Sequence, residues 1–582
     1  MTSTSRRHFL QYGVGAIGAA SVARLGTQPS WAAGISASRS ATARSAAGPT
    51  GPTGPSLRKY VEPVPQPGDG IVVASQVAPD RYAFSLREIR RHLHPDLPAT
   101  PVWAYDDGSG LSGQAGSLGM AIAATTGTPI TVSYTHHLPT TYPSWIPVDT
   151  RLTPLGNKVR FMTHLHGAFV AAADDGNPTE TPDGWGPGET QTVVYPNQAP
   201  QQSARTMWFH DHAMGATRLN VFAGLAGAYI LRDEYDTGQE PNPVGIPGGA
   251  YEIPLVIQDR MFNPDGTFLY PVSTIPGVTW IGEYFGDTML VNGKVWPYLE
   301  VEPRLYRLRI LNGCNARIMS LGIAGAGIWQ IGAEGGMWDR PVPMDQIVLT
   351  SAERADLIVD FRGLAGQTLH LVNSTPAAPV STPAPPLAPV MQIRVGRKVT
   401  EHGPTRIPAR LRGGRAAQLR RPDHTRYISL NEIDPDENSW YLNLNGAHFG
   451  DSVEKPRNNT VEDWVFVNTT MDTHPMHTHL FNHQVIGRTP FDVEAYETAN
   501  ATANGVPGGI DPTPWATGPM EPPTPDERGF KDTTKVNPGY FTTVRAKIEL
   551  PKGVTAPQTY VYHCHIVEHE DNDMMQPFTV VP

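Results

Sequence analysis

Residues 562–569 read Tyr562-His563-Cys564-His565-Ile566-Val567-Glu568-His569, and Met574 follows ten positions after the cysteine. A thiolate, imidazoles and a thioether together form the ligand set of a mononuclear electron-transfer copper site. On an extended strand, side chains alternate between faces, so Cys564 would point one way while His563 and His565 point the other. The segment therefore predicts one copper site beside the cysteine and a second metal site behind it, joined by a short covalent path.

Histidines spaced two residues apart recur elsewhere and can present both imidazoles to one side of an extended segment. They occur in His164-Leu165-His166-Gly167, in His210-Asp211-His212 and in His474-Pro475-Met476-His477-Thr478-His479. With His563, His565 and His569 they make ten histidines, half of the twenty in the chain. A single pair on a polar strand face is weak evidence of metal binding, whereas this repetition beside a His-Cys-His run indicates a site for several metal ions.

These motifs resemble those of the three-domain multicopper oxidases of the laccase group. That group carries His-x-His-Gly, His-x-His, His-x-x-His-x-His and His-Cys-His-x3-His-x4-Met. The likeness extends to residues 208–214, 217–220 and 290–297, and it covers roughly residues 60–582. Within the group, the chain is most similar to bacterial spore-coat laccase, and more broadly to bilirubin oxidases and phenoxazinone synthases.

The resemblance implies four copper ions and a role for each ligand. The type 1 copper would be held by His474, Cys564 and His569, with Met574 as the weak axial ligand. The type 2 copper would be held by His164 and His477. The type 3 pair would be held by His166, His210, His212, His479, His563 and His565. All ten histidines are then used, and an axial methionine suggests a moderate reduction potential.

The resemblance also implies the reaction. Electrons would leave a small aromatic reducing substrate one at a time at the type 1 copper and pass through Cys564 to His563 and His565. Four electrons and four protons would then reduce one O2 to two waters. Because one-electron withdrawal produces radicals, phenols, aminophenols and similar electron-rich aromatics fit as substrates.

Two acidic residues are candidates for carrying the protons. Asp175 lies nine residues after His166, and Glu570 directly follows His569. The resemblance places both near channels to the copper cluster. The alternative for each is an acid in a solvated loop, and the neighbouring Asp174 could take the place of Asp175.

Other functions fit the motifs less well. Bilirubin oxidase and phenoxazinone synthase activities remain open, since substrate pockets depend on loops. Cuprous oxidases usually carry a methionine-rich insert, and no methionine-dense segment is present. A two-domain copper nitrite reductase would lack the type 3 histidines. A non-catalytic copper-binding or coat protein would be expected to have a broken ligand set, whereas this set is intact.

The composition predicts an all-β protein. Glycine and proline, at 57 residues each, suit a chain with many turns, and 582 residues suffice for three domains. The resemblance implies three cupredoxin-like β-sandwich domains with Greek-key topology. We expect domain one at 58–235, a spacer domain two without ligand motifs at 250–397, an interdomain connection at 398–424, and domain three at 425–582. The trinuclear cluster must lie between domains one and three, because both supply its ligands.

The N-terminal segment predicts export. Arg6-Arg7 precedes a weakly apolar stretch, so residues 1–33 are expected to be a twin-arginine signal peptide, followed by a flexible linker rich in Gly, Pro, Ala and Ser at 34–57. The twin-arginine export machinery would be a partner, and the mature bacterial protein would be extracellular, cell-wall or periplasmic. A net charge of −10 gives no electrostatic reason to expect nucleic acid, and no apolar stretch suggests a membrane span. With Cys564 committed to copper, Cys314 has no disulfide partner.

Overall fold

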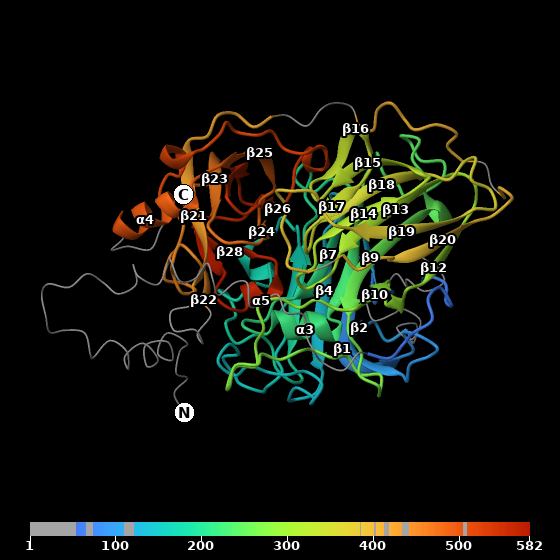
Figure 1. Ribbon diagram of the computed structural model, residues 1–582, viewed down its shortest axis with the longest axis horizontal. Helices are drawn as coiled ribbons and strands as arrows, with labels where there is room; N and C mark the ends of the chain where they lie inside the picture. The colour runs from blue at the N-terminus through green and yellow to red at the C-terminus, as the bar shows by residue number, and fades with distance from the viewer. Residues whose placement is uncertain are drawn as a thin grey trace, which may run out of the picture.

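The computed structural model describes residues 54–65, 74–109, 121–384, 386–400, 403–412, 418–433, 441–503 and 509–582. The predicted signal peptide and most of the predicted linker lie outside the described residues. The described residues form six β-sheets with few helices, which confirms the all-β class. In Figure 1 the strands gather into three neighbouring bodies, coloured blue to cyan, green to yellow and orange to red along the chain.

The first body pairs a sheet of order β2-β1-β4-β6 with one of order β3-β8-β7-β5. On β1, alternate residues such as Tyr82, Phe84 and Leu86 are buried, as expected of a strand with one face in a core. The elements are β1 Arg81–Arg91, β2 Thr100–Asp106, β3 Ile122–Thr125, β4 Ile130–His137, β5 Thr163–His166, η4 Ala172–Asp174, β6 Thr190–Tyr195, β7 Arg205–Asp211, α3 Thr217–Ala223 and β8 Ala226–Arg232.

The second body pairs a seven-stranded sheet, β11-β10-β9-β13-β18-β15-β16, with a five-stranded one, β12-β20-β19-β14-β17. Its elements are η5 Gly249–Tyr251, β9 Glu252–Arg260, β10 Thr288–Val291, β11 Lys294–Val295, β12 Tyr298–Val301, β13 Leu305–Asn312, β14 Met319–Ile323, β15 Gly327–Ala333, β16 Gly336–Met344, β17 Ile347–Leu349, β18 Arg354–Asp360, β19 Thr368–Ser374 and β20 Met391–Val395.

The third body pairs a five-stranded sheet, β22-β21-β23-β27-β25, with a four-stranded one, β26-β24-β28-β29. Between them, Trp464 packs edge-on against Tyr562, with ring centroids 5.2 Å apart. The elements are β21 His424–Ile433, β22 Tyr441–Leu444, β23 Thr460–Asn468, β24 His474–Thr478, β25 His483–Pro490, α4 Val493–Ala503, η6 Thr513–Trp515, η7 Pro525–Glu527, β26 Thr533–Val536, β27 Tyr540–Ile548, β28 Gln558–Cys564, α5 Val567–Glu570 and β29 Met575–Val580.

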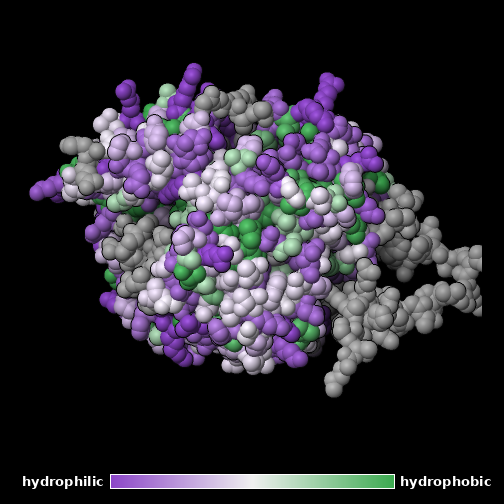
Figure 2. All heavy atoms as spheres, turned by 180° about the vertical axis from the view of Figure 1, so that it is seen from behind, coloured by the Kyte–Doolittle hydropathy of each residue, from purple (hydrophilic) through white to green (hydrophobic). Residues whose placement is uncertain are grey.

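The paired sheets span residues 81–232, 252–395 and 424–580; the first two lie inside the expected ranges 58–235 and 250–397, and the third begins one residue before the expected range 425–582. The exact domain boundaries stay a prediction. None of the helices among the described residues combines the length and apolar character needed to cross a membrane. Viewed from the opposite side, the surface is a mixture of hydrophilic and hydrophobic residues, with the hydrophobic ones gathered near the middle of that face (Figure 2).

Strand β13 differs from the expectation for an alternating strand, because it is buried on both faces. Its Arg307 donates to both carboxylate oxygens of Asp236, at 2.8 Å each. Arg309 donates to Thr206 of the first body at 2.9 Å. Buried arginines of this kind require paired carboxylates, since an unpaired buried charge is costly. The polar positions of β13 therefore join the first and second bodies instead of facing solvent.

Candidate metal centres

Three side chains of the third body converge where β24, β28 and α5 meet. The Sγ atom of Cys564 lies 3.5 Å from His474 Nδ1 and 3.8 Å from His569 Nδ1, and the two nitrogens are 3.3 Å apart. All three residues are buried. Two imidazoles and a thiolate in a triangle are the trigonal arrangement of electron-transfer copper sites.

Met574 lies beside this triangle. It is fully buried in the same hydrophobic cluster as Cys564. Its carbonyl accepts from the Cys564 N–H at 3.0 Å, and its own N–H donates to the His569 carbonyl at 3.0 Å. The backbone thus holds Met574 next to both ligands, and its role as the axial ligand stays a prediction.

The other eight histidines form a second site between the first and third bodies. In the first body, β5 and β7 place His164 opposite His210 in register. In the third, β24 and β28 place His477 opposite His563. The ring nitrogens of His212, His479 and His563 lie within 4.8 Å of one another, so one triad draws on both bodies. The complete set is His164, His166, His210, His212, His477, His479, His563 and His565.

Three further rings of the second site lie close together. The rings of His166 and His210 lie 5.0 and 5.1 Å from that of His565, measured between centroids. The remaining two, His164 and His477, have centroids 6.0 Å apart. All the predicted histidine ligands are therefore brought together in two sites, and the alternation of β28 separates Cys564 from His563 as expected.

Buried ring nitrogens point into the second site without hydrogen-bond partners. They include Nε2 of His164, His210 and His477, and Nδ1 of His166. Burial lowers the pKa of these four histidines, so their imidazoles are neutral, which is the form that binds a metal. Orphaned, neutral, converging imidazoles fit a cluster of copper ions, and the sulfur-containing triangle fits a single one.

Comparisons with known proteins agree with this geometry. Residues 155–236 and 419–582 match family profiles described as multicopper oxidase. The laccase of Bacillus subtilis is 34% identical over 547 residues, covering 90% of this chain and 99% of its own. The chain belongs to the multicopper oxidase family. The laccase of Haloferax volcanii is also 34% identical, covering all of this chain and 91% of its own.

A solved structure shares the fold. The McoA multicopper oxidase of Aquifex aeolicus superimposes with a TM-score of 0.69 at 24% identity, covering 90% of this chain and all of that one. This likeness supports three cupredoxin-like sandwiches, with sheets that are mixed rather than purely antiparallel. As a multicopper oxidase, the chain is a copper-dependent oxidoreductase that uses O2.

The multicopper oxidase ligands are oriented by hydrogen bonds on their far side. His164 Nδ1 donates to the Asp175 carbonyl at 2.6 Å, and His477 Nδ1 donates to the Asp532 carbonyl at 2.8 Å. Each bond fixes the tautomer that leaves Nε2 free for a metal. In the triangle, Nε2 of His474 lies 2.6 Å from the Thr470 hydroxyl.

Asp175 is buried against the eight-histidine site. Its Oδ2 accepts from His479 Nδ1 at 2.7 Å, while its Oδ1 is buried without a hydrogen-bond partner and lies 3.5 Å from His164 Nδ1. Burial raises the pKa of Asp175. Asp174 instead accepts from the Val194 N–H at 2.8 Å and has no contact with a ligand among the described residues, so the geometry separates the two neighbouring acids.

Glu570 lies on the other side of the site. Its carboxylate oxygens are 3.4 Å from His212 Nδ1 and 3.2 Å from His563 Nδ1. It also accepts from the Thr217 hydroxyl of α3 at 2.7 Å. Burial alone would raise the pKa of Glu570, but the neighbouring His212 and His563 lower it well below its ordinary value. The carboxylate thus contacts one ligand from each body as a hydrogen-bond acceptor.

Asp211, between two ligands, lies on the opposite face of β7. It accepts from the N–H groups of Met162 and Ala213 at 3.0 and 2.9 Å, and from Asn220 Nδ2 at 2.8 Å. Burial raises its pKa to about 7. It therefore ties the ligand-bearing strand to the segment before β5 and to α3.

Several residues that contact the ligand histidines lie outside the sequence motifs and were not predicted. Asp532 and Thr533 lie 3.0 and 3.1 Å from His166 Nε2. Glu283 lies 3.4 Å from His569 Nε2, and Glu432 lies 3.7 Å from His474 Nε2. All are more than forty positions away in sequence from the histidine that each contacts. No local spacing could have identified them.

Gly176, next to Asp175, offers a test of how tightly the site is packed. Its φ is +67°, and a Cβ there would lie 2.0 Å from the Thr163 carbonyl and 3.0 Å from His164 Cα. We expect Gly176→Ala to lower the free energy of unfolding by several kcal/mol, on the order of 3. Gly188→Ala is the control, because φ is +80° there but nothing lies within 4 Å. It should cost about 1 kcal/mol, and equal losses in chemical denaturation would contradict the packing argument.

Proposed function

We propose that the chain is a laccase-type oxidase of phenols or aminophenols that holds four copper ions, one at the Cys564 triangle and three among the eight histidines. Bound copper would supply one-electron acceptance at the first site and four-electron reduction of O2 at the second. The observation that carries the proposal is the place of Cys564 between His563 and His565. His563 and Cys564 end strand β28 and face the two sites in turn, and His565 follows directly after the strand.

The chain itself supplies the remaining functions. The peptide bonds from Cys564 to its two neighbours form a covalent route between the sites. Asp175 and Glu570 touch ligands from opposite sides and are proposed to hold and release the protons that water formation consumes. Complete burial of the eight histidines excludes bulk water from the place where oxygen would react.

A cationic reductant is a second candidate, favoured by two carboxylates. Glu283 and Glu432 lie against the outer nitrogens of the two triangle histidines. Burial raises the pKa of Glu432 well above its ordinary value. Where the carboxyls are ionised, their negative charge would attract an aromatic amine in its ammonium form or a divalent metal cation. Carboxylates suit hard cations better than cuprous ion, so a cuprous oxidase is less well supported.

The deciding experiment is oxygen uptake by the copper-loaded protein. The copper content per chain is measured first. Oxygen uptake is then compared in parallel with 2,6-dimethoxyphenol, an o-aminophenol, bilirubin and ferrous ion as reductants. We expect about four copper ions per chain, as three sites in one cluster and one apart would require, and faster turnover of the first two reductants. A preference for bilirubin or ferrous ion would replace the proposed substrate, and a blue protein that consumes no oxygen would refute the oxidase.

We also propose export by the twin-arginine route to an extracellular, cell-wall or periplasmic location. Support comes from Arg6-Arg7 ahead of an apolar stretch, and from metal sites that exist only in the folded chain. Replacing both arginines by lysine should leave the enzyme in the cytoplasmic fraction of a bacterial host. Unchanged export of that variant would refute the route.

A further inference from the structure

Arg354 reaches the eight-histidine site from the second body, which supplies no metal ligand. It begins β18, and its Nη1 and Nη2 donate to the two carboxylate oxygens of Asp532 at 2.8 and 2.6 Å. Two more of its five N–H donors are used as well, with Nε on the Thr206 carbonyl at 3.1 Å and Nη1 on that of Ala352 at 3.0 Å. A guanidinium so fully bonded holds its partner in one geometry.

Asp532 in turn contacts two of the histidines. Its Oδ1 lies 3.0 Å from His166 Nε2, and its carbonyl accepts from His477 Nδ1 at 2.8 Å. Because a carboxylate only accepts, His166 must carry its proton on Nε2, which leaves Nδ1 free to face the site. His164, His210 and His477 instead leave Nε2 free. Asp532 therefore decides which nitrogen His166 presents.

The close approach of this pair also accounts for the glycine after His166. Gly167 has a φ of +88°, and a Cβ there would lie 2.6 Å from Asp532 Oδ2 and 2.9 Å from Arg354 Nη2. Any side chain at position 167 would therefore collide with the Asp532 carboxylate and the Arg354 guanidinium. The glycine of the His-x-His-Gly motif thus serves the Arg354–Asp532 contact as well as the turn.

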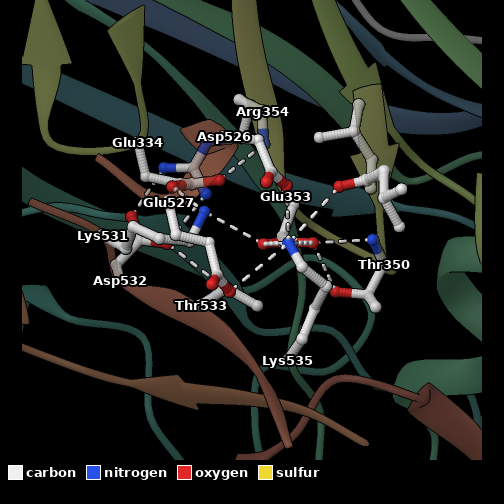
Figure 3. Close-up of polar contacts among 12 residues, drawn as sticks. Glu334, Thr350, Glu353, Arg354, Asp526, Glu527, Lys531, Asp532, Thr533 and Lys535 are labelled. Atoms are coloured by element: carbon white, nitrogen blue, oxygen red, sulfur yellow. Dashed lines mark hydrogen bonds and ion pairs between the residues drawn. The ribbon is translucent and has the colours of Figure 1, made fainter. Parts of the chain in front are cut away.

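A buried charge cluster anchors the pair. Three members come from the second body and three from the third, and in the order of their contacts the charges alternate in sign: Asp532, Arg354, Glu334, Lys531, Glu353 and Lys535. Glu334 accepts from the Arg354 N–H at 2.8 Å and from Lys531 Nζ at 2.7 Å. Glu353 lies 2.9 Å from Lys531 Nζ and 3.1 Å from Lys535 Nζ. Figure 3 shows these side chains pointing toward one another between the two bodies.

We propose that Arg354 is a positioning residue for oxygen reduction: through Asp532 it fixes the ring and tautomer of His166 and the place of His477. The second body is then more than a spacer, since it sets the geometry of ligands that it does not supply. The inference rests on the eight histidines forming the copper cluster of the proposed function.

The test is Arg354→Met in the copper-loaded, full-length protein, with Arg309→Met as control. Arg309 is also buried and also bridges two bodies, but its partners in the described part of the chain, Glu252, Thr206 and Asp236, make no contact with a ligand there. In Arg354→Met we expect the blue absorption of the triangle to persist, the electron paramagnetic resonance signal of type 2 copper to change, and kcat to fall about 10–100-fold. The control should lose thermal stability but keep the wild-type spectrum and KM for O2.

A double variant tests whether Arg354 acts through Asp532. The double variant Arg354→Met/Asp532→Asn should lose about as much activity as the more impaired single variant, because both changes break the same contact. Multiplied losses, or a wild-type resonance signal in Arg354→Met, would overturn the inference. If Arg354→Met fails to fold, Arg354→Lys keeps the charge, loses the fork and carries the same spectroscopic prediction. The resonance signal is recorded without turnover. A protein without oxidase activity would therefore contradict the proposed function and not this inference.

Discussion

Cys564→Ser is expected to abolish the blue absorption and oxidase activity while leaving the eight-histidine site able to bind copper. The sulfur is the only thiolate donor at the triangle, and its hydroxyl replacement is not deprotonated by a metal at neutral pH in the way a thiol is. The change should lower oxygen uptake to background, with about three of four copper ions retained per chain. Visible absorption, copper analysis and oxygen uptake on the same preparation check each part.

Cys314→Ser is the matched control. Cys314 is the other free cysteine and is also buried; its Sγ lies 3.8 Å from the Ile257 carbonyl, in the core of the second body. This variant should keep colour and activity and lose only some stability. Oxidase activity retained by Cys564→Ser would refute the path from Cys564 to His563 and His565.

Asp175→Asn is expected to lower kcat about 10–100-fold without changing the blue absorption, since residues that orient metal ligands have effects of this size. The amide can still accept the His479 Nδ1–H bond but cannot hold an exchangeable acid proton beside His164. The loss should therefore fall on the reoxidation of the reduced enzyme by O2. Stopped-flow mixing of reduced protein with oxygen would measure it directly.

Asp174→Asn serves as its control, because Asp174 bonds only to the Val194 N–H among the described contacts. Wild-type reoxidation is expected there. The reverse outcome, with Asp174→Asn slow and Asp175→Asn normal, would assign the proton role to the other acid.

The ligand set could be predicted because its information is local. His-x-His on a strand, or His-Cys-His at a strand end, fixes relative side-chain directions over two residues. Those directions hold in β5, β24 and β28, where register pairs His164 with His210 and His477 with His563. The fold class followed from composition and from the resemblance these motifs carry.

The residues that orient the ligands could not be predicted. Asp532 and His166 are 366 positions apart, and Arg354 is 178 positions from Asp532. Their contact depends on how three bodies pack together, which no spacing encodes. Packing between bodies also explains β13, where Arg307 and Arg309 alternate with apolar residues in the sequence but are buried, Arg307 as a partner of Asp236.

The division of the ligands along the chain has a consequence for biosynthesis. His479 is the seventh of the ten ligand histidines in sequence order, and the next ligand, His563, comes 84 positions later. While a ribosome is still adding those residues, the finished first sandwich can expose four histidines with neither the thiolate nor the partner strand. Neither centre can exist on the nascent chain, so copper must be acquired after translation has passed residue 574.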